Sequence, residues 1–325
     1  MKTLKCGFIN QAGAWVIEPQ FGEAESFSEG LAPVYVDGKW GYVDRIGSLV
    51  IQPQFNVARG FAGGRASVRD GDKWGYINQF GGFMIQPQFS SAKSFVAGLA
   101  AVRVHIDDQR EGYVDREGYW VIHFEFDSAE SFSEGLAAVT VDQKCGYISE
   151  SGSWAIEPHP IAAKRFIAAR SFSEGLAAVL IGGQHGWINH AGTVVIKPQI
   201  NGCESFSEGL ALVWVGNRCG FINPQGVQTI EPQFNYAESF SEGLALVRVD
   251  NPGALSKCGW INQAGALVIP PQFNSGKSFA EGLAPVKVGE LWGYINQAGV
   301  MVIPPQFGEA ESFSEGLALV GVVNG

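Results

Sequence analysis

Residues 6–38 read CGFINQAGAWVIEPQFGEAESFSEGLAPVYVDG, and the same pattern occurs nine times along the chain. Its most constant strings are a glycine between two larger residues, as at Cys6-Gly7-Phe8, and the run Gly-Leu-Ala-x-Val. Successive copies lie 34 residues apart except where three insertions lengthen the spacing. Self-similarity at a fixed period marks a repeat architecture. We therefore interpret residues 1–325 as a single repeat domain of nine units.

Each unit predicts three short strands. In the first copy these are residues 7–10, 15–17 and 31–36, where apolar and polar residues alternate or β-branched residues gather. Asp37-Gly38 is a strong signal for a two-residue hairpin turn into the next unit. The segment 21–30 has apolar residues spaced by three, which fits either a short helical turn or an irregular arch.

No segment carries the apolar i, i+3, i+4, i+7 pattern of a long amphipathic helix. Helical repeats of the same period are thereby excluded. The sequence predicts an all-β chain of nine tandem three-stranded repeats, with roughly 27 short strands in total.

The two termini predict that the chain closes on itself. It begins with a first strand and ends with a third strand, the two halves of the hairpin that joins neighbouring units. Residues 21–32 and 307–318 are identical, so the terminal copies are not altered into the polar caps of a linear array. We expect a closed ring, propeller-like or toroidal, without bare sheet edges at its ends. An open β-solenoid or superhelix is the alternative.

The charge and composition exclude several partners. With a net charge of −10, the chain lacks the basic surface that nucleic acid or an anionic membrane requires. It contains no run of 18 apolar residues and no apolar stretch after the first lysines that would mark a secretory signal. We expect no nucleic-acid partner, no membrane partner and a cytoplasmic location.

The strings Lys-Trp-Gly-Tyr, Asn/Asp-x-x-Gly, Val-Ile-x-Pro-Gln-Phe and Phe-x-Glu-Gly-Leu-Ala-x-Val are almost fully present in residues 39–68 and 73–102. In this they resemble the bacterial WG (KWG) repeat family, which is also common in cyanobacteria. The resemblance covers the whole chain. It implies a role in protein interaction and brings no catalytic residues. One departure is that tryptophan precedes the glycine only at Trp40, Trp74 and Trp292.

No catalytic or metal-binding constellation emerges from the sequence. The five histidines show no two-His helical spacing, and no Cys-x-x-Cys is present. Four of the five cysteines are equivalent repeat positions, which is not the pattern of a disulfide framework. We expect a protein that is not an enzyme and binds no cofactor and no metal.

The residues that recur at equivalent places of several copies are interpreted first as structural. Ile17, Phe27, Leu31 and Val34, with their equivalents, are expected in the core. The glutamate before the second glycine is expected to satisfy backbone N–H groups of the turn, with a shared ring of binding carboxylates as the alternative. The recurring residues are Gly7, Gly41, Gly75, Gly146, Gly220, Gly259, Gly293, Trp40, Trp74, Trp292, Glu29, Glu134, Glu174, Glu208, Glu242, Glu281 and Glu315.

The places where the repeat is interrupted are the candidates for partner binding, because loops on a rigid scaffold often carry recognition. Insertions lie at residues 105–110, 159–170 and 250–257. The second is unusual because it gathers positive charge in an acidic chain. The candidate partner-binding residues are Lys164, Arg165, Arg170, His105, Asp107 and Asp108.

Three functions fit these observations. The first is a non-enzymatic scaffold for protein–protein interaction with a partner that the sequence does not name. The second is a multivalent glycan-binding module, for instance for cell-wall sugar, with one shallow pocket per repeat. The third is a self-assembling structural protein.

Overall fold

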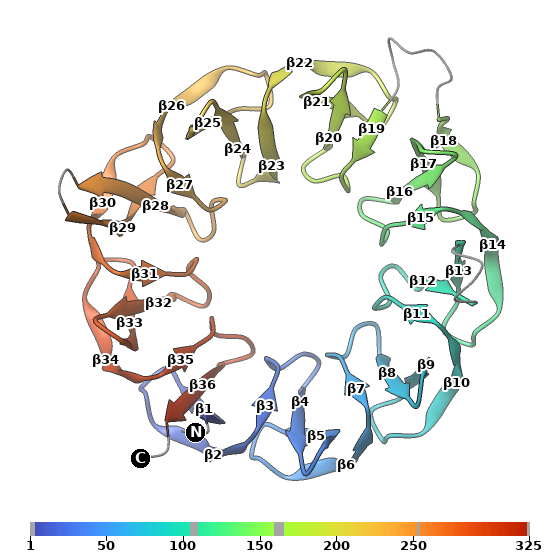
Figure 1. Cartoon of the computed structure of the whole chain (residues 1–325), viewed down its shortest axis with the longest axis horizontal. Coiled ribbons are helices and arrows are strands. Elements are labelled where there is room, and N and C mark those ends of the chain that lie inside the picture. The colour runs from blue at the N-terminus through green and yellow to red at the C-terminus, as the bar shows by residue number, and fades with distance from the viewer. Residues whose placement is uncertain (1–3, 105–109, 159–165, 252–253, 324–325) are drawn as a thin grey trace. The chain divides into compact units, whose positions relative to one another are not determined.

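The computed structural model of the protein describes residues 4–104, 110–158, 166–251 and 254–323. Within these residues, 36 strands form nine four-stranded antiparallel sheets (Figure 1). The all-β class predicted from the sequence is confirmed. No helix among the described residues has the length and apolar character that crossing a membrane requires.

The strands of the nine sheets follow one order, a first strand of two to six residues, two central strands and an outer strand. The first five sheets are β35 (Glu309–Ala310), β36 (Leu317–Val323), β1 (Leu4–Asn10), β2 (Trp15–Phe21); β3 (Glu23–Ala24), β4 (Leu31–Val36), β5 (Lys39–Asp44), β6 (Leu49–Phe55); β7 (Val57–Ala58), β8 (Ala66–Asp70), β9 (Lys73–Ile77), β10 (Phe83–Phe89); β11 (Ser91–Ala92), β12 (Ala100–Arg103), β13 (Glu111–Val114), β14 (Trp120–Phe126); and β15 (Ser128–Ala129), β16 (Leu136–Val141), β17 (Lys144–Ser149), β18 (Trp154–Ile156).

The other four sheets are β19 (Phe166–Ala169), β20 (Leu176–Ile181), β21 (Gln184–Asn189), β22 (Val194–Ile200); β23 (Gly202–Ser207), β24 (Leu210–Val215), β25 (Arg218–Ile222), β26 (Gln228–Phe234); β27 (Tyr236–Ala237), β28 (Leu244–Asn251), β29 (Ala254–Asn262), β30 (Leu267–Phe273); and β31 (Ser275–Gly276), β32 (Leu283–Val288), β33 (Leu291–Asn296), β34 (Met301–Phe307). By internal contacts the chain divides into two compact units. One comprises residues 1–54, 217–221 and 228–325, and the other comprises residues 55–216 and 222–227.

The predicted Asp-Gly hairpin joins the two central strands of a sheet. β4 and β5 pair from Leu31 opposite Asp44 to Val36 opposite Lys39. Asp37 and Gly38 between them have φ values of 49° and 86°. Positive φ at both central residues defines the type I′ turn, whose twist matches that of the flanking strands. The sheet is therefore built from the end of one sequence repeat and the start of the next.

The prediction of three strands per repeat is wrong, because the segment 21–30 is neither a helical turn nor an arch. Ser28 and Leu31 exchange two backbone hydrogen bonds of 3.0 and 3.3 Å around a second tight turn. That turn folds a strand of only two residues, β3, against the β4 residues Val34 and Tyr35. A strand so short leaves no periodic signal, which is why 36 strands occur where roughly 27 were expected.

The outer strand runs through a proline and continues four residues beyond the expected bounds of 15–17. β2 extends from Trp15 through Pro19 to Phe21. Proline has no N–H to donate, so it is tolerated because β2 lies at the edge of its sheet. Two bulges interrupt the pairing of β1 with β2. Gly7 is required there, because a Cβ on it would lie 2.5 Å from the carbonyl oxygen of Ile17.

The closure expected from the termini is confirmed. β1 pairs with β36 along seven residues, from Leu4 opposite Val323 to Asn10 opposite Leu317, in the sheet β2-β1-β36-β35. The open array is excluded because the first and last strands complete one sheet. The fold class is a nine-bladed β-propeller, in which each blade is one of these four-stranded sheets.

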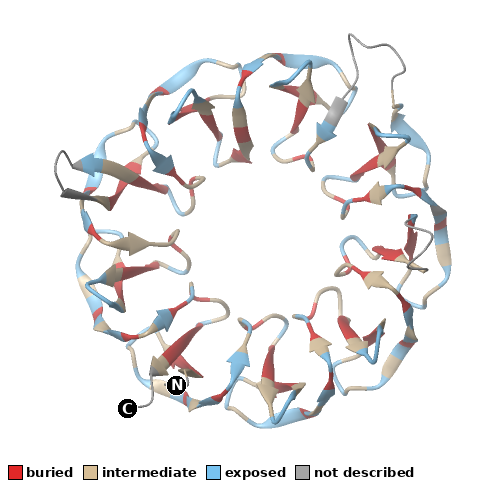
Figure 2. Ribbon diagram, viewed as in Figure 1, coloured by how far each residue is buried: buried red, intermediate tan, exposed pale blue. Residues whose placement is uncertain are grey.

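The core lies between adjacent sheets and is formed by the recurring apolar residues. Ile17, Phe27, Leu31 and Val34 are between 0 and 7 % exposed, as predicted. Figure 2 shows the buried residues concentrated on the two central strands of each sheet. Each sheet is too thin to bury both of its faces alone, so packing against the neighbouring repeat supplies its hydrophobic stabilisation.

The turn between β1 and β2 also packs on the neighbouring repeat. Asn10 Oδ1 accepts hydrogen bonds of 3.0 Å from the N–H groups of Ala12 and Ala14. This side-chain turn explains the Asn/Asp-x-x-Gly string. Gly13 completes it at a φ of 79°, and a Cβ on Gly13 would lie 3.0 Å from Ile303 in β34.

Candidate functional site in the turns that join neighbouring repeats

The string Ser-Glu-Gly, present in six of the nine copies, ties one repeat to the next. The N–H of Gly30 donates a hydrogen bond of 3.0 Å to the carboxylate of Glu315, and Ser314 Oγ donates one of 2.8 Å to the carbonyl of Phe27. We call this arrangement the clasp. The Gly-to-Glu bond recurs, at 2.9 to 3.0 Å, for Gly175 with Glu134, Gly209 with Glu174, Gly282 with Glu242 and Gly316 with Glu281.

The clasp glutamates adopt an unusual backbone conformation. All seven predicted glutamates, including Glu29 and Glu208, have φ values between 52° and 55°. This left-handed region is sparsely populated by residues other than glycine. Each of the five glutamates with a Gly-to-Glu bond described above accepts an N–H from the turn of the next repeat rather than from its own turn. The glutamate therefore joins repeats.

A third group reaches the clasp from the Asn/Asp turn of another repeat. Arg45 Nη2 lies 2.7 Å from Glu315 Oε2, and His190 Nε2 lies 3.3 Å from Glu134 Oε2. Burial acts to raise the pKa of Glu315, but hydrogen bonds from Arg45 and Gly30 outweigh it and hold that pKa below its usual value. The carboxylate is thus kept ionised by a guanidinium and a backbone N–H.

Copies two and three depart from this arrangement. Ala62 and Gly63 stand where the second copy would have serine and glutamate, and Val96 and Ala97 stand at the same places in the third copy. These two contacts between repeats lack both clasp side chains. The Asn/Asp turns of the third and fourth copies carry exposed aromatic side chains. Phe80 is 89 % exposed and Tyr119 is 73 % exposed.

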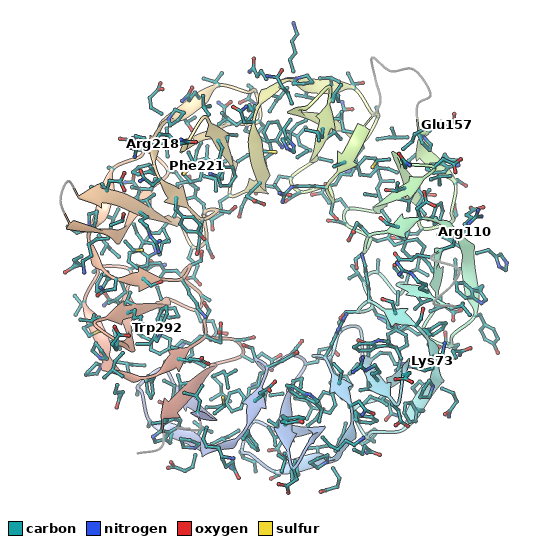
Figure 3. All side chains as sticks on the ribbon, viewed as in Figure 1. Lys73, Arg110, Glu157, Arg218, Phe221 and Trp292 are labelled. Carbon is teal, nitrogen blue, oxygen red and sulfur yellow. The ribbon has the colours of Figure 1, made fainter. Side chains whose placement is uncertain are left out.

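The residue before the recurring glycine faces the neighbouring repeat and changes its chemistry from copy to copy. Lys277 Nζ lies 5.7 Å from the ring centre of Trp292, which Figure 3 labels. Where the fourth copy has Glu111, that side chain is buried and pairs with Arg103 at 2.8 Å. Its other oxygen accepts a 2.8 Å hydrogen bond from the N–H of Ala129 in the next sheet.

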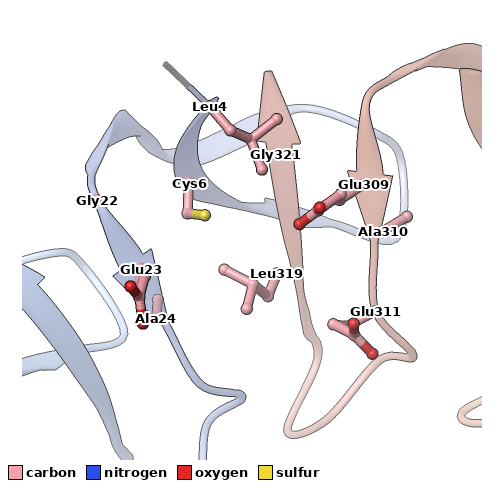
Figure 4. Close-up of a pocket in the computed structure, with 10 residues that line it drawn as sticks. All are labelled: Leu4, Cys6, Gly22, Glu23, Ala24, Glu309, Ala310, Glu311, Leu319 and Gly321. Carbon is pink, nitrogen blue, oxygen red and sulfur yellow. The ribbon is translucent and has the colours of Figure 1, made fainter. Parts of the chain in front are cut away.

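Cavities between repeats lie beside this position in several copies. One, of about 380 Å³, lies beside Cys6 and Leu319 between β36 and β3 (Figure 4). A second, of about 210 Å³, lies beside Cys145 at the equivalent place in another repeat. A third, of about 420 Å³, lies beside Trp292.

The cavities differ in charge, although they occupy equivalent places. Three carboxylates, those of Glu23, Glu309 and Glu311, line the cavity beside Cys6. Glu309 and Glu311 also line the cavity beside Trp292, where Lys277 and Lys287 balance their charge. Burial and the carboxylates of Glu309 and Glu23 raise the pKa of the Cys6 thiol. A thiol so placed stays protonated, and only the thiolate is a strong nucleophile.

The candidate residues of the insertions are described only in part. Lys164, Arg165, His105, Asp107 and Asp108 lie outside the described residues. The remaining candidate, Arg170, pairs its Nη1 with Glu204 of the next repeat at 2.5 Å. In the part of the chain that the structure describes, no three His, Cys, Asp or Glu side chains are grouped as metal ligands would be.

Sequence reasoning missed the clasp and the exposed turns. The signal was present in the serine and glutamate that vanish together at positions 62–63 and 96–97. Its meaning depends on knowing that these side chains contact the next repeat, which is a tertiary relation.

The fold is similar to that of solved structures at low sequence identity. A structure described as "Crystal structure of the eukaryotic initiation factor" matches with a TM-score of 0.67 and 10% identity, over 99% of this chain and 98% of that one. Hsv2p of Kluyveromyces lactis matches with a TM-score of 0.44 and 9% identity, over 73% of this chain and 91% of that one. The similarity to the first structure concerns the fold alone, and the similarity to the second is weak. No curated protein sequence matches the chain.

The sequence profile of the family described as "WG containing repeat" matches eight segments of the chain. They are residues 7–40, 40–74, 74–105, 112–145, 186–219, 220–251, 259–292 and 292–325. The copy between residues 146 and 185 is not among them and contains the longest insertion. Because these segments cover nearly the whole chain, the protein belongs to the WG repeat family.

Proposed function

We propose that the protein is a non-enzymatic scaffold that binds a partner protein through the turns around Phe80 and Tyr119. The observation that carries this proposal is the exposure of the two aromatic side chains, 89 % and 73 %. At the place of Phe80, four other repeats have alanine, as at Ala12 and Ala264, and the second copy has Ile46, which is 77 % exposed. Aromatic side chains are enriched in protein interfaces because they bury a large area at little entropic cost.

The differences between repeats also favour a protein partner over a repetitive ligand. A glycan-binding array would present near-identical pockets for multivalent binding. The cavities beside Cys6, Cys145 and Trp292 differ in their lining side chains and in charge. A surface with different chemistry at equivalent places suits a partner that is itself irregular.

The proposal is tested by affinity capture followed by binding measurements with the captured partner. We expect the double variant Phe80→Ser/Tyr119→Ser to lose at least tenfold in affinity and to keep the unfolding temperature of the wild type. Val300→Ser is the matched control, because Val300 occupies the place of Tyr119 in another repeat and is 58 % exposed.

Two outcomes would contradict this proposal. Unchanged affinity in the double variant would show that the turns are not the contact surface. Affinity that depends instead on Lys164 and Arg165 would place recognition at the insertion of residues 159–170.

A further inference from the structure

A complete clasp brings together a carboxylate, a backbone N–H and a cationic side chain. At the clasp position of the second copy, the N–H and the cationic side chain are present, but the carboxylate is missing. In the complete clasp of Glu315, the carboxylate is held by the N–H of Gly30 and by Arg45. The equivalents for the second copy are the N–H of Gly98 and the guanidinium of Arg116, while Gly63 replaces the glutamate. We call this set the open clasp.

The geometry places the guanidinium where the missing side chain would begin. Arg116 Nη2 lies 3.1 Å from the position that a Cβ on Gly63 would occupy. Gly63 has a φ of 62°, close to the 55° of Glu315, so its backbone already has the clasp conformation. Within the described residues, neither the Arg116 guanidinium nor the Gly98 N–H has a hydrogen-bond partner.

The third copy provides an internal contrast. It also lacks the clasp glutamate, because Ala97 stands there, and it leaves the N–H of Gly135 without an acceptor among the described residues. The turn residue equivalent to Arg116, however, is Glu150. A carboxylate next to this site repels an anion. Among the described residues, the open clasp of the second copy alone combines a cation with an open N–H.

We propose that the open clasp binds a carboxylate supplied from outside the chain, namely an aspartate or glutamate side chain of a partner protein. The chemical class follows from the complete clasps, where the same pair of donors holds a carboxylate. A guanidinium beside a backbone N–H offers charge-assisted hydrogen bonds to such a group.

The surroundings explain why the carboxylate belongs to a protein. Tyr119 lies in the same turn as Arg116, and Phe80 lies in the corresponding turn of the preceding repeat. The turn that contains Arg116 packs on that preceding repeat, because a Cβ on Gly118 would lie 3.2 Å from Ile85 of β10. An acidic residue flanked by apolar ones matches this surface. This identification of the source rests on the proposed function, whereas the carboxylate site itself does not.

The first experiment follows arginine side-chain and glycine amide NMR signals while sodium acetate is added to the full chain. We expect the Arg116 Nε–Hε and Gly98 amide signals to shift saturably. The Arg45 signal should not shift, because its guanidinium is already paired with the carboxylate of Glu315. In Arg116→Gln and Gly63→Glu, the shift of the Gly98 amide should fall at least fivefold. Equal responses of Arg45 and Arg116, or a Gly98 shift that persists in Gly63→Glu, would overturn the site.

Sodium sulfate and sodium chloride at matched ionic strength test the chemical class. Shifts as large as those with acetate would show a general anion effect and overturn the assignment to carboxylate. The peptides acetyl-Phe-Glu-Phe-amide and acetyl-Phe-Gln-Phe-amide then test the source. We expect the first to bind at least tenfold more tightly than the second and more tightly than acetate.

The failures of the two proposals are distinguishable. If acetate and the Glu and Gln peptides bind equally, the partner-derived carboxylate is rejected, although the turns can still capture a partner through Phe80 and Tyr119. If the Glu peptide binds as expected but Phe80→Ser/Tyr119→Ser leaves partner affinity unchanged, the open clasp stands and the proposed contact surface is rejected.

Discussion

The N–H of Gly30 donates a hydrogen bond to the carboxylate of Glu315, a residue 285 positions away in the chain. The bond joins the last repeat to the first, next to the sheet in which β1 and β36 pair. It has the same form as the bonds between consecutive repeats, so the closure of the chain uses the ordinary contact between repeats. Closure thus needs no special residues at the termini.

The clasp of Glu315 should make stability depend on pH. Because the pKa of Glu315 is lowered in the folded chain, its contribution is present above the unfolded value of 4.5 and is lost as the pH falls through the folded value. We expect Glu315→Gln to lower the free energy of unfolding by about 1 kcal/mol at pH 7, since the side chain is partly exposed. Urea unfolding at several pH values measures this. The difference between wild type and variant should shrink below pH 4.5, and a constant difference would argue against the clasp.

Substitution of Glu111 should lower the free energy of unfolding more than substitution of a clasp glutamate, because Glu111 is buried. Glu111→Ala leaves Arg103 and the N–H of Ala129 without their acceptor. We expect a loss of about 3 kcal/mol in the free energy of unfolding, as when one partner of a buried ion pair is removed. Glu117→Ala is the control, because Glu117 is exposed and other repeats have alanine at its place. Equal unfolding temperatures for the two variants would contradict the role assigned to Glu111.

The recurring glycine between two larger residues, such as Gly41 between Trp40 and Tyr42, should not tolerate a methyl group. In Gly41→Ala the new Cβ would lie 2.5 Å from the carbonyl oxygen of Ile51 and 2.8 Å from the nitrogen of Pro53. We expect a loss of about 2–3 kcal/mol, because backbone atoms cannot move aside as a flexible side chain would. Gly22→Ala, whose nearest contact would be 3.5 Å, should change stability by less than about 0.5 kcal/mol. Thermal unfolding of the two variants compares them.

The buried cysteines should resist thiol reagents while the chain is folded. Burial raises the pKa of Cys203 to about 12 and that of Cys219 to about 11. At pH 8 the reactive thiolate is therefore a minor species, and both sulfurs are also shielded from solvent. We expect an aromatic disulfide reagent to label both cysteines only after denaturation. Peptide mass spectrometry of the treated protein identifies the labelled cysteines. A cysteine introduced by Ala264→Cys at an exposed turn should react at once, and equally fast labelling of Cys203 would refute the expectation.

The sequence predicted those features of the fold that depend on local pattern. The Asp37-Gly38 hairpin, the strand at residues 31–36 and the pairing of the termini all occur as expected. The first two rest on residues adjacent in the chain, whose turn chemistry or alternation can be recognised without a structure. The third follows from the phase of the repeat at the two ends of the chain. The strand β3 was missed, because two residues carry no periodicity and the positive φ of Glu29 runs against the preference of glutamate.

The sequence by itself determined that the chain is a β repeat of nine units and that its ends are complementary halves of one hairpin. Only the tertiary structure decided what the recurring glutamates contact, because the N–H that five of them accept belongs to another repeat. The open clasp is the clearest case. Gly63 is an unremarked substitution in the sequence, and it becomes informative only when Gly98 and Arg116, 35 and 53 residues further on, are seen to stand around it. Contacts between repeats are set by packing across the chain, which no local pattern records.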